Sequence, residues 1–295
     1  MCDEHSLDDM VDYLNRKAEL SRRSFGALAL GAGLSITLPR VANAVAVTES
    51  NVEIKTPDGV CDAYFVHPTS GASAAVLIWP DAGGLREAFK QMGKRLAESG
   101  YTVLVPNPFY RTRRADAPAA APNASGVQDE AARTAMMATM RSLNPTTHVT
   151  DAKAFVAWLD AQPATDKKKK MGTTGYCMGG PIVFRTAATF PDRIGGAATF
   201  HGGGLVADNT DSPHLLIPKM KAQYLIAIAA NDDERQPDAK DVLRKSFAEA
   251  KLPAEIEVYK DTKHGWCPPD GAVYDAAQAE KAWSRMTELF KKALV

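Results

Sequence analysis

Short apolar runs recur along the chain from about residue 50 onward, and longer stretches of mixed polarity separate them. The run A-A-V-L-I-W-P at 74–80 is continuously apolar, which is typical of a strand buried on both faces of a sheet. We expect further strands at 102–109, 173–176, 197–200, 224–230 and 255–259. Helices are expected between and after them, at 85–99, 127–142, 147–161, 181–189, 234–251 and 274–294. This alternation predicts an α/β fold with a mostly parallel central sheet flanked by helices on both faces.

An antiparallel hairpin is expected ahead of these elements. V-E-I-K-T-P-D-G and C-D-A-Y-F-V-H-P have the composition of paired strands, with Asp58 and Gly59 in the turn. A stretch rich in Pro and Ala at 115–125 predicts a loop. No internal repeat is visible, and the roughly 250 residues from 45 to 295 are enough for one α/β domain.

The first 44 residues have the pattern of an export signal. S-R-R-S-F at 21–25 is a twin-arginine pair, and the apolar run that follows at 27–38 is shorter than the ~20 residues that span a bilayer. Ala42-Asn43-Ala44 is a small-x-small cleavage motif. The segment resembles a Tat-type signal, although a buried helix with a chance arginine pair would show a similar pattern. We therefore expect a signal peptide at 1–44, a mature domain at 45–295 without a membrane span, export by the Tat machinery and a periplasmic location.

Charge and cysteine content narrow the function classes. Lys and Arg number 35, as do Asp and Glu, so the net charge gives no reason to expect nucleic acid or an anionic membrane as partner. Cys2 lies in the predicted signal, and the remaining Cys61, Cys177 and Cys267 leave at least one free thiol in an oxidising compartment. The sequence leaves open whether Cys61 and Cys267 are free or paired. It contains no C-x-x-C, so neither a thioredoxin-type site nor a zinc knuckle is indicated.

The segment G-T-T-G-Y-C-M-G-G-P at 172–181 points to a cysteine nucleophile. Gly175 and Gly179 bracket Cys177 with the spacing of the nucleophile elbow G-x-S-x-G, with sulfur in place of oxygen. The segment lies between an expected strand and an expected helix, where a tight turn needs residues without side chains. The N-terminus of the following helix favours a thiolate. The alternative is a small cysteine buried in the core.

A triad on such a fold needs an acid and then a histidine downstream of the nucleophile. The strand at 224–230 ends in N-D-D-E, so Asp232 or Asp233 lies at the carboxyl edge of the sheet. His264 follows the next strand and reaches the same edge. Three other histidines, His67, His148 and His214, fit surface or core positions.

These residues together resemble the dienelactone hydrolase family of α/β-hydrolases, over essentially all of 50–292. G-Y-C-M-G-G is the specific mark, because most α/β-hydrolases carry serine there. The resemblance implies that Asp232, in A-A-N-D, is the acid and that His264 is the histidine. It implies a carboxylate near the nucleophile at Asp81, in W-P-D-A-G-G-L-R, for which capping of the next helix is the alternative. The oxyanion hole would consist of the backbone N–H groups of Ala82 and Met178.

The family's clamp for a substrate carboxylate is incomplete in this sequence. Arg133 occupies one arginine position, but Met137 stands at the tyrosine position and Pro268 at the second arginine position. Met137 and Trp266 therefore suggest a more apolar pocket. H-G-G-G at 201–204 imitates an esterase oxyanion motif, but it follows the nucleophile in the chain, so we expect His201 only to line the pocket.

The sequence thus predicts an exported cysteine hydrolase acting on a small-molecule ester or lactone through Cys177, His264 and Asp232, with no metal and no organic cofactor required. A thioesterase or another carboxylesterase of the same fold is an alternative. Two alternatives belong to other classes. One is a periplasmic thiol redox protein with Cys267 as resolving cysteine, and the other is a binding protein on a hydrolase scaffold.

Overall fold

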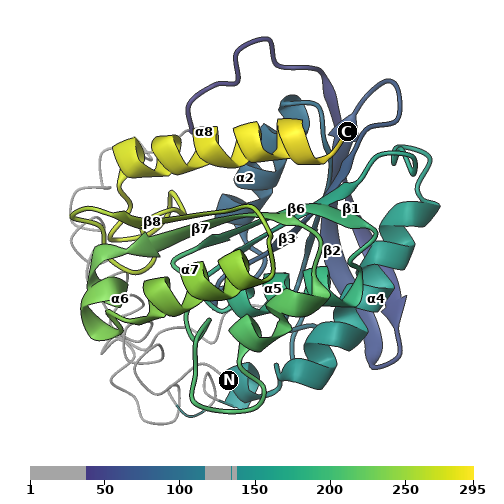
Figure 1. The fold of residues 1–295 in the computed structure, drawn as a ribbon. Helices are drawn as coiled ribbons and strands as arrows, with labels where there is room; N and C mark the ends of the chain where they lie inside the picture. Colours follow the sequence, from purple (N-terminus) through teal and green to yellow (C-terminus); the bar gives the residue numbers. More distant parts are fainter. Residues whose placement is uncertain (1–37, 117–133, 135–137) are drawn as a thin grey trace, which may run out of the picture.

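A single twisted sheet organises the molecule (Figure 1). The computed structural model describes residues 38–116, 134 and 138–295. The strand order in these ranges is β1-β2-β4-β3-β5-β6-β7-β8. The strands are β1 (Val47–Thr56), β2 (Gly59–Pro68), β3 (Ala75–Trp79), β4 (Thr102–Pro106), β5 (Met171–Tyr176), β6 (Ile194–Phe200), β7 (Gln223–Ala229) and β8 (Ala254–Tyr259).

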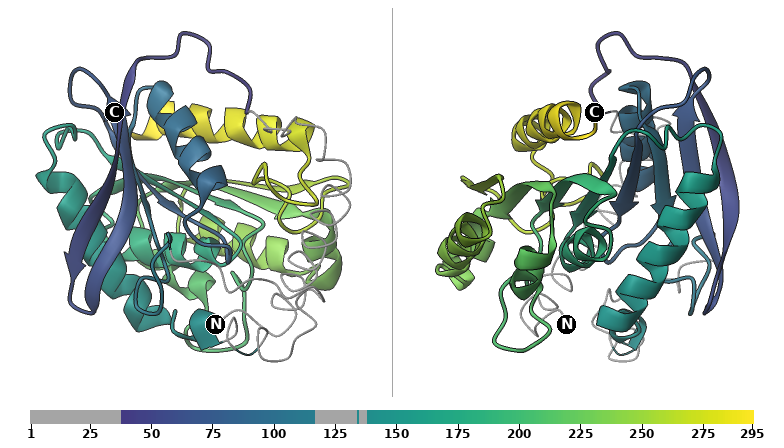
Figure 2. Two further views of the ribbon diagram at one scale, coloured as in Figure 1. Left: turned by 180° about the vertical axis from the view of Figure 1, so that it is seen from behind. Right: turned by 45° about the vertical axis from the view of Figure 1, so that its right-hand side comes forward.

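Helices cover both faces of this sheet, which confirms the predicted architecture. Helices α2 (Glu87–Glu98) and α8 (Ala276–Ala293) lie over one face (Figures 1 and 2). Helices α4 (Pro145–Ala161), α5 (Gly179–Thr189) and α7 (Ala239–Glu249) lie over the other. A short helix α6 (Ala230–Arg235) and the 3₁₀ helix η3 (Pro213–Lys219) occupy connections.

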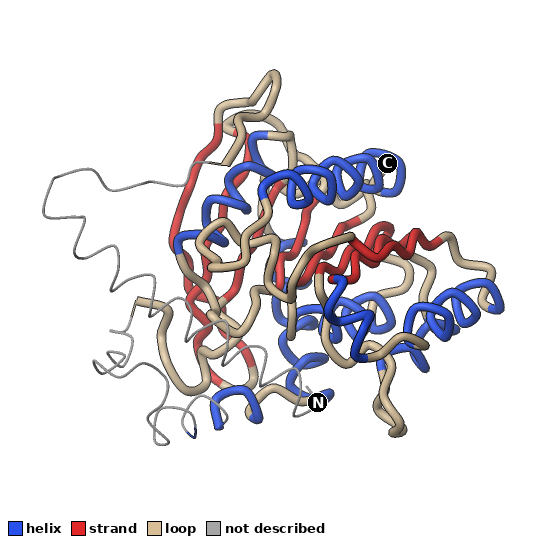
Figure 3. The backbone as a smooth tube through the Cα atoms, turned by 90° about the vertical axis from the view of Figure 1, so that its left-hand side faces the viewer, coloured by secondary structure: helices blue, strands red, loops and turns tan. Residues whose placement is uncertain are grey.

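The apolar runs form strands because both of their faces are buried. All five residues of β3 are buried, and they alternate between the two halves of the core. Leu77 and Trp79 pack on the side of α4 and α5, whereas Val76 and Ile78 pack on the side of α2 and α8. Strands β3 to β8 all run parallel to one another. Strand β2 lies beside β4 and pairs with it antiparallel. The strands turn progressively across the sheet, as twisted sheets do (Figure 3).

The structure corrects two predicted boundaries. The hairpin pairs Thr56 with Gly59, so Pro57 and Asp58 form the turn and Gly59 already belongs to β2. The helix expected at 234–251 is two helices, α6 and α7, separated at 236–238. Pro237 explains the break, because proline disfavours helical backbone in the residue before it. Most of the helix expected at 127–142 lies outside the described residues.

Only the last part of the predicted signal peptide, from Leu38 to Ala44, lies among the described residues. Ala42, Asn43 and Ala44 are exposed, and Asn43 has a left-handed backbone with φ of 58°. Leu38 packs against the half of the core under α2 and α8. None of the helices in the described ranges is both long enough and apolar enough to cross a bilayer.

Candidate active site

Five neighbouring parallel strands end at one edge of the sheet, and each is followed by a residue singled out from the sequence. In sheet order the strands are β3, β5, β6, β7 and β8. The residues that follow them are, in the same order, Asp81 with Ala82, Cys177, His201, Asp232 and His264. Carboxyl ends of parallel strands are the usual place for sites in such sheets, because the connecting loops converge there.

Cys177 lies on a tight turn between β5 and α5. Its backbone is left-handed, with φ of 54°, which is uncommon for a residue other than glycine. A Cβ atom on Gly175 would lie 2.4 Å from the carbonyl oxygen of Gly179, and one on Gly179 would lie 2.5 Å from that of Trp79. The turn therefore requires glycine at both positions. Because α5 begins at Gly179, its N-terminus lies beside Cys177 and favours negative charge on the sulfur.

His264 is held by a carboxylate from the neighbouring loop. Its Nδ1 lies 2.9 and 3.0 Å from the two oxygens of Asp232. The adjacent Asp233 instead pairs with Lys240 at 2.7 Å. Burial works to lower the pKa of His264, but the charges of Cys177 and Asp232 oppose it and raise that pKa well above its ordinary value. The imidazolium form is thus favoured next to the sulfur.

Two side chains that the sequence reasoning passed over position this pair. The N–H of His264 donates to Oδ1 of Asn231 at 2.8 Å. Thr262 accepts a hydrogen bond from the N–H of Ala230 at 3.2 Å and donates one to the carbonyl of Tyr259 at 2.7 Å. Asn231 directly precedes Asp232, and Thr262 lies two residues before His264. Their closeness in sequence to the expected triad residues is the signal that could have identified them.

Ala82 and Met178, the two residues expected to form an oxyanion hole, lie beside Cys177. Both are buried and pack with Cys177, Phe109 and Met140 in one small apolar cluster. Within the described part of the chain, neither uses its N–H in a loop or turn hydrogen bond. Met178 directly precedes the first residue of α5, so its N–H lies at the helix N-terminus. Both residues thus belong to the immediate surroundings of Cys177.

Asp81 borders a small cavity beside Cys177, but its carboxylate is bound by other residues. Arg86 binds Oδ1 at 2.6 Å and Oδ2 at 3.0 Å, and the N–H of Gly83 donates to Oδ1 at 2.8 Å. The same guanidinium binds Asp270, in the loop beyond His264, at 2.8 and 3.0 Å. Asp81 does not cap α2 either, because that helix begins at Glu87 and has no side-chain cap. The carboxylate instead closes the turn after β3 and, through Arg86, ties two loops together.

A small cavity joins these groups. Its lining residues are Asp81, Ala82, Gly83, Cys177, His201, His264 and Gly265. The H-G-G-G segment packs directly against the elbow, since a Cβ on Gly180 would lie 2.8 Å from the Cα of Gly202. Trp266 lies in the core, stacked on Tyr259 at 4.7 Å, and is not on the wall of this cavity. Arg133 and Met137 lie outside the described residues, and Pro268 is buried.

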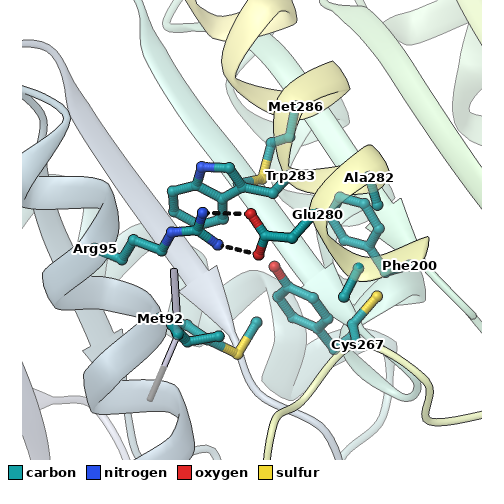
Figure 4. Close-up of a pocket in the computed structure, with 11 residues that line it drawn as sticks. Met92, Arg95, Phe200, Cys267, Glu280, Ala282, Trp283 and Met286 are labelled. Atoms are coloured by element: carbon teal, nitrogen blue, oxygen red, sulfur yellow. Dashed lines mark hydrogen bonds and ion pairs between the residues drawn. The ribbon is translucent and has the colours of Figure 1, made fainter. Parts of the chain in front are cut away.

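A second, apolar cavity lies between α2 and α8 (Figure 4). Met92, Trp283 and Met286 line it, and a paired Arg95 and Glu280 stand at 2.6 Å on its border. Cys267 faces this cavity and not the one that Cys177 borders. Cys61, Cys177 and Cys267 are all unbridged, and burial raises the pKa of Cys267 well above its usual range. In the described ranges, no three His, Cys, Asp or Glu side chains are arranged to hold a metal ion.

Known proteins give a consistent set of relatives. The model of the dienelactone hydrolase family matches residues 61–294. A protein provisionally named carboxymethylenebutenolidase, from Methylorubrum extorquens, is 26% identical over 299 residues, which cover 97% of this chain and 98% of the relative. The carboxymethylenebutenolidase of Rhodococcus opacus is 25% identical over 251 residues, covering 81% of this chain and 90% of the relative.

Solved structures share the fold. One from Klebsiella pneumoniae, provisionally described as a dienelactone hydrolase, matches with a TM-score of 0.70 at 20% identity. The match covers 84% of this chain and 99% of that structure. The chain therefore has the α/β-hydrolase fold that its sequence predicts.

Proposed function

Because the chain belongs to the dienelactone hydrolase family, we propose that it hydrolyses small esters or lactones with Cys177 as the nucleophile. The observation that carries the proposal is the meeting of three features in one cavity: a cysteine on a strained turn, the N-terminus of α5 behind it, and a histidine paired with Asp232.

The proposed reaction begins with a proton transfer from Cys177 to His264, whose imidazolium Asp232 stabilises and orients. The thiolate attacks the carbonyl carbon, and the N–H groups of Ala82 and Met178 bind the oxyanion that forms. His264 then protonates the leaving alcohol as the C–O bond breaks, which leaves an acyl thioester on Cys177. Water hydrolyses this thioester and restores the thiol.

The charge around the cavity favours a neutral substrate. Asp81 is neutralised by Arg86, and Arg86 in turn serves two carboxylates. Pro268 supplies no cation at the second clamp position. A carboxylate substrate would therefore find no bidentate arginine pair among the described residues, and such recognition is not replaceable by apolar side chains. We propose small neutral esters or lactones as the substrate class.

We also propose that the chain acts in the periplasm after export by the Tat machinery. The twin-arginine pair, the apolar run and Ala42-Asn43-Ala44 support this proposal. The exposure of that motif would allow a peptidase to reach it. Cell fractionation with antibody detection, comparing the wild type with a variant in which Arg22 and Arg23 are both lysine, tests it: retention of the variant in the cytoplasm is expected.

Hydrolysis of p-nitrophenyl acetate by the full-length chain tests the nucleophile. We expect Cys177→Ala to abolish turnover and labelling by iodoacetamide at that position, and Cys177→Ser to be poor because a hydroxyl needs stronger activation than a thiol. Cys267→Ala is the matched control and should keep its activity, because its sulfur faces the other cavity. Turnover that survives in Cys177→Ala would overturn the proposal. Equal loss in both variants would instead favour a two-cysteine redox protein.

A matched pair of substrates, a dienelactone acid and its methyl ester, tests the substrate class. We expect the ester to be hydrolysed at least as well as the acid. A preference for the acid above about a hundredfold in kcat/KM, which corresponds to about 2.7 kcal/mol, would contradict the neutral-substrate proposal.

A further inference from the structure

His201 is a second histidine in the cavity, and the triad does not account for it. It directly follows β6 and has a left-handed backbone, with φ of 41°. Its N–H donates to the carbonyl of Ala227 at 2.8 Å, which anchors the turn to β7. The side chain is 1% exposed and borders the cavity shared by Cys177 and His264. The centres of the two imidazole rings are 5.1 Å apart, and the rings are inclined at 70°.

Within the described part of the chain, the hydrogen-bonding groups of this imidazole have no protein partner. Neither Nδ1 nor Nε2 of His201 finds one among the described residues. A buried polar group without a partner costs about 1–3 kcal/mol, and buried polar groups are almost always satisfied by protein or by water. Burial, and then the charge of His264, hold the pKa of His201 well below its ordinary value. The ring is therefore neutral and offers one donor and one acceptor.

The cavity has room for about one water molecule, and unpartnered polar groups border it. The free space beside Cys177 is close to that of a single water, and a water is held where two or more polar groups surround it. His201 provides such a group, and so does Nε2 of His264, which is equally buried and unpartnered in the described part of the chain.

The sheet order puts His201 and His264 on the side of the nucleophile opposite Ala82. Cys177 follows β5, with β3 on one side and β6 on the other. Ala82, an oxyanion donor, follows β3. His201 and His264 follow β6 and β8 and thus lie on the opposite side, where the base acts.

We propose that His201 binds and orients the water that hydrolyses the acyl thioester on Cys177. The inference rests on the proposed function and assigns a residue to its second half. In this step the water donates one hydrogen bond to His201 and gives a proton to Nε2 of His264. Its oxygen bonds to the acyl carbon, the C–S bond breaks with its electron pair on sulfur, and the carboxylic acid leaves. Thiolate and imidazolium remain, and return of the proton from His264 to sulfur restores the thiol. His201 neither gains nor loses a proton.

Pre-steady-state hydrolysis of p-nitrophenyl acetate by the full-length chain separates acylation of Cys177 from hydrolysis of the acyl thioester. In His201→Phe we expect the first equivalent of p-nitrophenolate to appear at nearly the wild-type rate, since acylation needs no water. Steady-state turnover should fall by about a hundredfold, the cost of misplacing a reacting group by about 1 Å. Intact-mass measurement during turnover should then show a larger fraction of Cys177 acetylated than in the wild type.

Two further variants exclude a merely structural effect. His201→Gln keeps a donor and an acceptor and should recover part of the steady-state rate. His148→Phe, at a buried histidine of α4 outside the cavity, should leave the ratio of the two phases unchanged. The inference is wrong if acylation and turnover fall together in His201→Phe, if neither changes, or if the acetylated fraction does not rise. Turnover without any dependence on Cys177 would instead contradict the proposed function itself.

Discussion

The ion pairs of Arg86 join the two loops that border the nucleophile, and their loss should be felt in both stability and catalysis. Arg86 links Asp81, in the loop that carries Ala82, to Asp270, beyond His264. We expect Arg86→Gln to lower the free energy of unfolding and the rate of ester hydrolysis, because one loop positions an oxyanion donor and the other positions the base.

The burial of Asp81 sets the magnitude of the stability loss. Its side chain is 7% exposed, against 31% for Asp270. Removing one partner of a buried pair costs about 3–5 kcal/mol, because the other charge stays buried. The N–H of Gly83 still binds Asp81 in the variant, so we expect about 3 kcal/mol. That is a large part of the roughly 5–15 kcal/mol by which domains are stable.

Urea unfolding followed by tryptophan fluorescence measures this loss, and kcat/KM for p-nitrophenyl acetate measures the catalytic effect. Displacement of Ala82 should lower kcat by up to about a hundredfold, the usual value for one oxyanion donor. Asp270→Asn is the matched control and should cost about 1 kcal/mol or less, since that carboxylate is more exposed. The double variant Asp81→Asn with Arg86→Gln removes both buried charges and should regain most of the stability.

A loss of less than about 1 kcal/mol of unfolding free energy in Arg86→Gln would refute this reasoning. The pair of Arg86 and Asp81 would then contribute no more than a solvent-exposed ion pair does. A double variant no more stable than Arg86→Gln would also refute it, since the cost would then not come from an uncompensated carboxylate.

The remaining predictions concern the two acids and the proton on His264. Asp232→Asn should lower kcat/KM by up to about 10⁴-fold, as loss of the orienting acid does in triads. Asp233→Asn should change kcat/KM less than about threefold, because Asp233 pairs with Lys240. The reverse ranking in steady-state assays would show that Asp233 is the acid. Cys177→Ala should lower the pKa of His264 measured by NMR, since the charge of Cys177 is the largest contribution that raises it. Because that pKa is raised in the folded state, the stability it contributes is full below about pH 6.5, the ordinary value in an unfolded chain, and is lost as pH rises through the folded value. An unchanged His264 titration in Cys177→Ala would contradict the coupling.

Most of the sheet could be predicted because burial on both faces leaves a simple trace in the sequence. The strand expected at 74–80 is β3 (Ala75–Trp79), and that expected at 224–230 is β7 (Gln223–Ala229). The break between α6 and α7 was missed because residues 231–238, N-D-D-E-R-Q-P-D, carry no apolar pattern that marks a boundary, while the constraint of proline on its neighbour is local.

The site could be located from chain order, but its hydrogen bonds could not. Parallel strands in sequence place Cys177, His264 and either Asp232 or Asp233 at one edge, and the family resemblance selected Asp232 as the acid. Arg86 and Asp270 are 184 residues apart, and nothing local to either indicates the other. The direction of the His201 side chain depends on its left-handed backbone, which no pattern in the sequence predicts.

The engagement of Asp81 bears on which group would take the proton of Cys177 in the proposed reaction. The resemblance suggested a carboxylate near the sulfur for that task, yet three N–H donors from Arg86 and Gly83 already hold the carboxylate of Asp81. These bonds hold the carboxylate in the turn after β3, and none of them is to Cys177. His264 has Nδ1 bound to Asp232 and Nε2 toward the cavity, so it is the better acceptor. We therefore expect His264 to be the group that takes the proton of Cys177 in the proposed reaction, and this transfer requires no charge on the substrate. This is the electrostatic reason for proposing neutral esters and lactones.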